Sequence, residues 1–141
     1  MINEIFPCLW FDGNAKEAAN FYCGIFNDSK ILQENPMVVM FEIDGFKIMA
    51  LNGGPHFKFN EATSLVINCN NQQQIDNYWD KLTSDGGQES MCGWVKDKFG
   101  FSWQIVPSNL GKIMSDPEKA SRAMALLMQM KKIDVAKLEE A

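Results

Sequence analysis

The sequence predicts an α+β fold made of two βαβββ modules followed by a helical tail. The first observation is the order of elements, because a strand, an amphipathic helix and three further strands occur in residues 4–52 and again in residues 62–107. The second is a constant spacing: Asn71 lies 57 residues after Asn14, and Tyr78 lies 57 residues after Phe21. Internal similarity in the same order along the chain indicates a repeated unit.

The first module is expected to contain one helix and four strands. Asn14, followed three residues later by Glu17, resembles a capping box, and the helix ends near Asn27. Asp44-Gly45 has the composition of a two-residue hairpin turn. We expect the strands at residues 5–11, 29–33, 37–43 and 46–51.

The second module repeats this order. Asn71 with Gln74 has the pattern of a helix cap, and Gly86-Gly87 ends the helix. Its apolar stripe, Ile75, Tyr78, Trp79 and Leu82, has helical spacing. We expect its strands at residues 64–69, 88–91, 92–96 and 101–106.

The last two strands form a hairpin around Asp97-Lys98-Phe99-Gly100, where we expect Asp97 and Lys98 to be a solvated turn pair. Alternation along the final strand predicts Phe101, Trp103 and Ile105 on one face and Ser102, Gln104 and Val106 on the other. Two interpretations remain open: the hairpin lines a ligand cavity, or its tryptophans pack in the core.

The tail predicts a helix from Ser115 to about Lys131, because Asp116-Pro117-Glu118 is typical of a helix start. Its apolar stripe contains Ala120, Met124, Leu127 and Met128, which either packs on its own domain or binds a partner. Asp134 is expected to cap a short final helix.

Composition limits the class of protein. A chain of 141 residues with 46% hydrophobic residues predicts one domain, residues 1–110, with an extension at residues 111–141. The net charge of −5 argues against a nucleic-acid partner. No 18-residue apolar run and no basic, apolar leader occur, so we expect neither a membrane span nor a signal peptide, and a cytoplasmic location.

The four cysteines form no CxxC pair, and His56 is the only histidine. Scattered positions of this kind do not predict a zinc site. Cys8 and Cys69 fall in expected strands and Cys23 in an expected helix, so reduced and mostly buried thiols are predicted.

Several runs carry a family resemblance. They are Trp10-Phe11-Asp12-Gly13-Asn14-Ala15, residues 50–55, residues 57–62, Cys92-Gly93-Trp94 and residues 103–107. With the two modules, they resemble the PhnB-like, or 3-demethylubiquinone-9 3-methyltransferase, branch of the vicinal-oxygen-chelate superfamily of glyoxalases, bleomycin-resistance proteins and dioxygenases. The resemblance covers about residues 4–110 and implies a homodimer with a cavity in each curved sheet.

A methyltransferase activity would come from the family name alone. The common S-adenosylmethionine fold has a Gly-rich loop that follows a strand and opens a helix. Asn52-Gly53-Gly54-Pro55 follows an expected strand, but no periodic helix comes after it. The residues therefore predict no methyl-donor site.

Metal-using members of the superfamily bind a divalent ion through His, Gln and Glu side chains. The resemblance places Gln104 at a ligand position of the second module, and the hairpin spacing places Met49 at the equivalent position of the first. Neither is a carboxylate, and a thioether is a poor ligand for a hard cation. We therefore expect a cavity without metal and without any other cofactor.

Candidate site residues fall into two groups. His56 and Glu61 are the candidates for acid–base catalysis; the alternatives are a solvated loop histidine and a surface carboxylate. The expected ligand-binding residues are Trp10, Phe41, Met49, Asn52, Asn68, Trp94, Trp103 and Gln104. An aromatic lining with few polar groups is typical of a small-molecule site.

Two functions remain open. The first is a metal-free protein that binds a small aromatic or amphipathic molecule. The second is an enzyme of lyase, isomerase, dioxygenase or methyltransferase type that acts on a small quinone-like substrate. Fold does not distinguish them, because one fold carries many functions.

Overall fold

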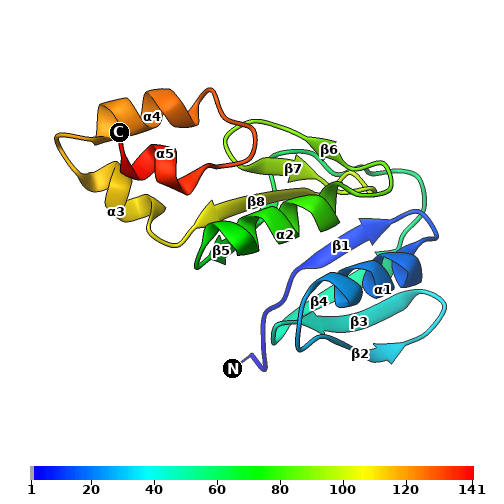
Figure 1. The fold of residues 1–141 in the computed structure, drawn as a ribbon. Coiled ribbons are helices and arrows are strands. Elements are labelled where there is room, and N and C mark those ends of the chain that lie inside the picture. The colour runs from blue at the N-terminus through cyan, green and yellow to red at the C-terminus, as the bar shows by residue number, and fades with distance from the viewer. Residues whose placement is uncertain (1) are drawn as a thin grey trace. The chain divides into compact units, whose positions relative to one another are not determined.

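A computed structural model describes residues 2–141. The chain forms two compact units, one reaching to Phe59 and one from Asn60 to Ala141. The units contain the two predicted modules (Figure 1). The C-terminal helices belong to the second unit, so the tail is built into the second module's own core.

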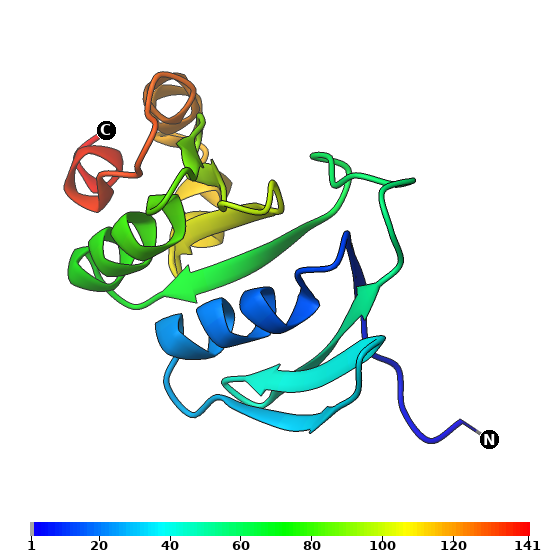
Figure 2. The ribbon, with the colours of Figure 1, turned by 90° about the vertical axis from the view of Figure 1, so that its right-hand side faces the viewer.

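The first unit is a four-stranded sheet with one helix. Its elements are β1 (Cys8–Phe11), α1 (Ala15–Ile25), β2 (Lys30–Glu34), β3 (Val38–Ile43) and β4 (Phe46–Asn52). The strand order is β1-β4-β3-β2, with β1 parallel to β4 and the remaining pairs antiparallel. Helix α1 lies along one face of this sheet (Figure 2).

Local sequence explains most of the first unit. Asp44 and Gly45 have φ values of 49° and 80°, which are the two positive values that a tight hairpin turn requires, so the predicted turn is confirmed. Ala18, Tyr22 and Ile25, which have helical spacing, are buried on one face of α1. The predicted side-chain cap is wrong: Asn14 is the N-cap residue but its side chain makes no capping hydrogen bond.

The second unit repeats the same topology. Its elements are β5 (Ser64–Cys69), α2 (Gln72–Thr83), β6 (Gln88–Glu89), β7 (Trp94–Lys96) and β8 (Ser102–Pro107). The order β5-β8-β7-β6 matches that of the first sheet, and β5 is parallel to β8. Asn71 caps α2 as predicted, accepting a hydrogen bond from the backbone N–H of Gln74 at 2.9 Å. The α+β fold of two βαβββ modules is confirmed.

Three short helices follow: α3 (Leu110–Ser115), α4 (Ala120–Leu127) and α5 (Val135–Glu139). They enclose an apolar cluster whose buried members are Val106, Ile113, Ala123, Leu127, Ile133 and Leu138. The helix predicted from Ser115 to about Lys131 is shorter than expected, because α4 covers only Ala120–Leu127, whereas the short final helix capped by Asp134 is confirmed. Met124 and Met128 are 47% and 60% exposed, because the buried stripe of α4 uses Ala123 and Leu127 instead.

Backbone contacts fasten the tail to the sheet. The N–H of Cys92 donates to the carbonyl of Met130 at 2.7 Å, and that of Gly93 donates to the carbonyl of Lys131 at 2.8 Å. Gly93 has φ +86°, and a Cβ there would lie 2.8 Å from Cδ1 of Ile133. Only glycine allows this approach.

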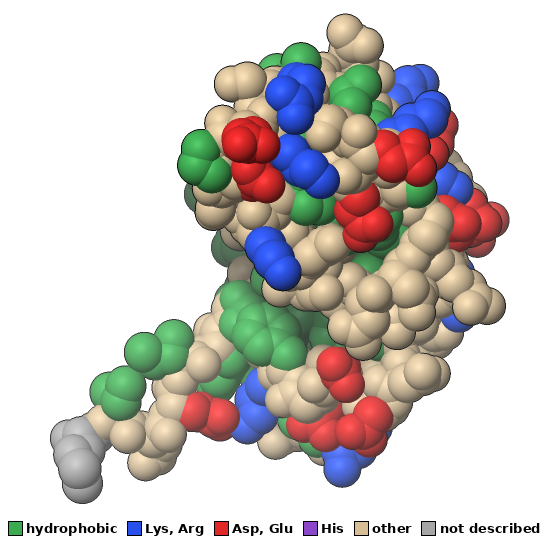
Figure 3. Space-filling model, turned by 60° about the vertical axis from the view of Figure 1, so that its left-hand side comes forward, with side chains coloured by type: hydrophobic (Ala, Val, Ile, Leu, Met, Phe, Trp, Pro, Cys, Tyr) green, Lys and Arg blue, Asp and Glu red, His purple; other side chains and the backbone are tan. Residues whose placement is uncertain are grey.

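The surface of the protein carries charges of both signs. On the face drawn in Figure 3, acidic and basic side chains are interspersed, as on a solvated surface. No helix within residues 2–141 is both long and apolar enough to cross a membrane. All four cysteines are free thiols, but Cys8 is exposed, so the expectation of mostly buried thiols is wrong for it; Cys69 is buried.

Candidate functional site

The second sheet has two faces of different chemistry. The face against α2 is buried and apolar, with Val95, Trp103 and Ile105. Strand pairing places Trp94 opposite Gln104 and Lys96 opposite Ser102. Because paired residues project to the same side, these four side chains lie on the other face, which we call the site face.

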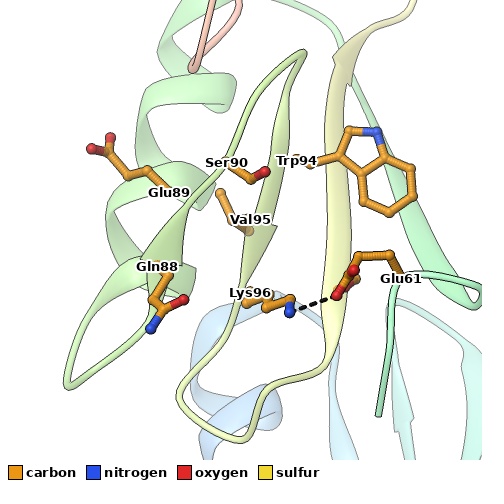
Figure 4. A pocket seen from close by; sticks show the side chains of 8 residues that line it. Glu61, Gln88, Glu89, Ser90, Trp94, Val95 and Lys96 are labelled. Atoms are coloured by element: carbon orange, nitrogen blue, oxygen red, sulfur yellow. Dashed lines mark ion pairs between the residues drawn. The ribbon is translucent and has the colours of Figure 1, made fainter.

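A pocket of about 240 Å³ borders the site face (Figure 4). Its walls come from the segment before β5, from β6 and β7, and from the start of β8. The lining residues are Glu61, Gln88, Glu89, Ser90, Trp94, Val95, Lys96 and Ser102. The pocket therefore combines one indole ring with several polar groups, a combination that suits a small ligand with a polar end.

An ion pair occupies the polar side of this pocket. Nζ of Lys96 lies 2.5 Å from Oε1 of Glu61, and the two side chains are 38% and 62% exposed. The hydrogen bond from Lys96 and its positive charge lower the pKa of the Glu61 carboxyl. Glu61 is thus ionised at neutral pH, and it neutralises the one cationic side chain that lines the pocket.

A second polar group in the pocket has no such partner. Ser102 is fully buried, and its Oγ has no hydrogen-bond partner among the described residues. A buried hydroxyl without a partner costs roughly 1–3 kcal/mol. The nearby Gln104 does have a hydrogen-bond partner, because its Nε2 donates to Oγ of Ser64 at 2.9 Å. The pocket therefore holds an unused donor beside a charged side chain.

The turn below the pocket is held by a buried carboxylate. Asp97 is 2% exposed and accepts hydrogen bonds from the backbone N–H groups of Phe99 and Phe101, at 2.9 and 3.1 Å. It also accepts one from Nε1 of Trp103 at 2.9 Å. The prediction of a solvated turn pair is therefore wrong for Asp97. Trp103, which we expected in a ligand site, lies on the α2 face.

Two of the expected ligand-binding residues share a face in the first unit. Cys8 pairs with Met49 in β1 and β4, so Trp10, two residues on, lies on the same side as Met49, away from α1. Nε1 of Trp10 donates to the carbonyl of Gly54 at 2.8 Å, and its ring meets that of Phe57 edge-on. Both residues are half-buried on this face.

Phe41 and Asn52 serve the first unit's own structure. Phe41 is fully buried on the α1 side and stacks on Tyr22 with ring centroids 6.0 Å apart. Oδ1 of Asn52 accepts from the N–H of Ala15 at 2.9 Å, and its Nδ2 donates to the carbonyl of Pro36 at 3.1 Å. The first-unit side chain that caps α1 is thus Asn52, and neither residue has the placement expected of a cavity lining.

Of the remaining predicted site residues, some line the pocket and others do not. Glu61 and Trp94 line the pocket together, as Figure 4 shows. His56 is exposed in the first unit, and Asn68 is exposed on β5; neither lines this pocket. Lys96 and Ser102 are pocket residues that the sequence interpretation did not select. Alternation did place Ser102 beside Gln104, and that was the available signal.

The residues at the position used by metal-binding relatives do not suit a divalent cation. Gln104 and Ser64 are neutral and bonded to each other, and their neighbours Val66 and Trp94 offer no ligand atom suited to a hard cation. Within residues 2–141, no three or more His, Cys, Asp and Glu side chains gather as a metal site would require.

The glycines after β4 have a packing role. A Cβ on Gly53 would lie 2.4 Å from Cε2 of Trp10, so a side chain there would displace the indole. The N–H groups of Gly53 and Gly54 donate to the carbonyl of Phe11 at 2.9 and 3.3 Å. This loop opens no helix, and its N–H groups are used within the fold rather than for a nucleotide.

Comparison with known proteins agrees with this architecture. The family described as 3-demethylubiquinone-9 3-methyltransferase matches residues 3–106. The chain belongs to this family. No curated protein matches the chain.

Several solved structures share this architecture. A PhnB protein from Bacillus cereus is 29% identical, with a TM-score of 0.67 over 74% of this chain and 99% of that one. A protein from Pseudomonas aeruginosa is 20% identical, with a TM-score of 0.61 over 74% and 96%. The fosfomycin resistance protein FosX from Listeria monocytogenes, complexed with Mn(II) and sulfate, is 14% identical, with a TM-score of 0.61 over 81% and 97%. The last two show the fold alone.

Proposed function

We propose that this family member binds a small aromatic or amphipathic molecule in the pocket of the second unit, without a divalent metal ion. The observation that carries the proposal is the joining of the Trp94 indole to Lys96 and Ser102 in one cavity of about 240 Å³. Six of the eight lining residues are polar or charged, so Trp94 and Val95 supply the apolar contact and the polar groups orient the ligand. The neutral, mutually bonded pair Gln104 and Ser64 supports the absence of metal.

Native mass spectrometry of gently purified protein tests this proposal. We expect a retained small molecule, no stoichiometric metal and, because proteins of this superfamily typically dimerise, the mass of a homodimer. Trp94→Ala should reduce ligand occupancy at least tenfold, since aromatic contacts contribute about 0.5–1.5 kcal/mol beyond burial. Phe46→Ala, an exposed aromatic of the first unit, is the matched control. One metal per subunit whose removal releases the ligand would contradict the proposal.

The alternative is an enzyme acting on a small quinone-like substrate, as the family's description suggests. Glu61 would be its acid–base group, because it is the pocket carboxylate beside Lys96. Calorimetry with S-adenosylmethionine separates the methyltransferase version from the binding function. We expect no heat of binding, since the described residues contain no Gly-rich loop that opens a helix. Saturable binding would favour the enzyme.

A further inference from the structure

Lys96 and Ser102 form a matched pair of donors in the pocket. They are paired across β7 and β8, so their Cβ atoms are about 5 Å apart on the same face. An ammonium group and a hydroxyl on one face of the sheet can both donate hydrogen bonds to a single group with two acceptor atoms. A carboxylate has that form, and its charge complements Lys96.

Ser102 is the part of this pair that the fold leaves unused. Its Oγ is buried, lines the pocket and meets no acceptor among residues 2–141. Buried polar groups are nearly always paired, so an orphaned one needs an explanation. A ligand with one acceptor atom at Lys96 and a second that reaches Ser102 would supply the missing partner.

Glu61 already occupies the part of this position next to Lys96, but its carboxylate makes no hydrogen bond with Ser102. Its carboxylate lies 2.5 Å from Nζ of Lys96, yet its side chain is 62% exposed. The segment bearing it is held locally, by the N–H of Ala62 donating to Oδ1 of Asn60 at 2.9 Å. Exposed ion pairs of this kind contribute little to stability, so another anion can displace Glu61 into solvent.

The other acidic group of the pocket does not compete for Lys96. Glu89 points away from Lys96 (Figure 4), and its Oε2 accepts a hydrogen bond from Nε1 of Trp79 at 2.6 Å. Trp94 lies on the same side of β7 as Glu61. A flat ring beside Trp94 would therefore bring a carboxylate attached to it toward Lys96.

We infer that the ligand is a small aromatic carboxylate, which replaces the Glu61 carboxylate at Lys96 and accepts a hydrogen bond from Ser102. This inference rests on the proposed function and adds the chemical class of the ligand. Glu61 acts as a built-in competitor, so the charge of Lys96 is neutralised both before and after binding. Binding weakens as salt rises, because Lys96 is partly exposed.

Titration of ¹⁵N-labelled full-length protein with benzoate, benzyl alcohol and benzylamine tests the inference. Benzoate is expected to shift the amide signals of Trp94, Lys96 and Ser102 and to bind at least tenfold more tightly than the other two. Glu61→Gln should raise benzoate affinity several-fold, because the competing charge is removed. Lys96→Met should lower it at least tenfold. Lys81→Met, an exposed lysine of α2 with the same change in charge, should leave it unchanged.

Ser102→Ala provides an independent reading. It should weaken benzoate binding and leave the thermal midpoint of the free protein unchanged or raised, because no hydrogen bond is lost. A lowered midpoint would mean that Ser102 has a structural partner, and its assignment would fail.

The outcomes separate the two proposals. If benzyl alcohol binds as tightly as benzoate and Lys96→Met changes neither, the carboxylate inference is wrong and the aromatic pocket stands. If none of the three probes shifts these signals up to its solubility limit, both proposals are wrong.

Discussion

The two modules share one strand order, but the turn and the helix cap that are stabilised by neighbouring residues in one module are stabilised by distant or buried residues in the other. In the first module, the hairpin turn at Asp44-Gly45 is local and exposed. The cap of its helix is distant, because Oδ1 of Asn52 accepts a hydrogen bond from the N–H of Ala15, 37 residues earlier in the chain. In the second, the helix cap is local, at Asn71, whereas the turn depends on the buried Asp97. A repeated topology therefore does not imply repeated interactions. Its hydrogen bonds can be supplied locally or from a distance.

Replacing the turn carboxylates should reveal this difference most strongly. Asp97→Ala removes the acceptor of three hydrogen bonds, two of them from buried groups, so the free energy of unfolding should fall by about 3–4 kcal/mol. Asp44→Ala keeps a strained positive φ and should cost about 1 kcal/mol. Urea unfolding followed by tryptophan fluorescence measures both. Equal losses would contradict the comparison.

Replacing the residues that cap the two helices should destabilise the first module more than the second, the reverse of the turn substitutions, and the losses of unfolding free energy should be smaller. Asn52→Ala removes an accepted and a donated hydrogen bond and should cost about 2 kcal/mol, whereas Asn71→Ala removes one cap and should cost about 1 kcal/mol. Asn14→Ala serves as the control, because its side chain makes no capping bond, and its effect should stay within about 0.5 kcal/mol. A larger loss for Asn14 would mean that it, rather than Asn52, caps α1.

The reactivity of the thiols should differ between the two modules, although the thiols have little effect on stability at neutral pH. Burial raises the pKa of Cys69 to about 11 and also raises that of Cys8, but Cys8 on β1 is exposed whereas Cys69 is buried. Iodoacetamide at pH 8 should therefore label Cys8 before Cys69, as read by peptide mass spectrometry. In denaturant the order should disappear.

The raised pKa of Cys69 also predicts how the stability of the protein changes with pH. The folded-state pKa of Cys69 is above its unfolded value of 9.0, so the unfolded state loses this proton first as pH rises. The free energy of unfolding should consequently fall between pH 9 and about pH 11. No change with pH in this window for wild type relative to Cys69→Ser would contradict the assignment.

Local sequence was sufficient for the frame of the fold. The Asp44-Gly45 turn, the Asn71 cap and the apolar stripes of both helices depend on neighbours within a few residues, so pattern alone predicts them. Asn52 and Asp97 could not be assigned, because their partners are defined only once distant segments meet. Whether Met124 and Met128 are buried or exposed stayed open for a related reason. The stripe that is buried depends on where the tail turns.

The candidate site followed the same division. Trp94 and Glu61 were identifiable by residue type and position, and both line the pocket. Ser102 and Lys96 look ordinary in the sequence, and their importance comes from strand pairing and from an unmet hydrogen bond. Phe41 and Trp103 were selected because they are aromatic, although alternation already assigned Trp103 to the face opposite Gln104.

The attachment of the tail has a consequence for synthesis on the ribosome. The first module has every strand and its helix by Asn52, so it can fold while the rest of the chain is still being made. The second cannot complete its core until Ile133 and Leu138 have been added, because they pack with Val106 beyond the last strand. Gln72 binds the backbone at Ile133 and Val135, so the start of α2 also waits for these residues. The nascent protein therefore carries a complete first module while the apolar cluster of the second unit still lacks its last members.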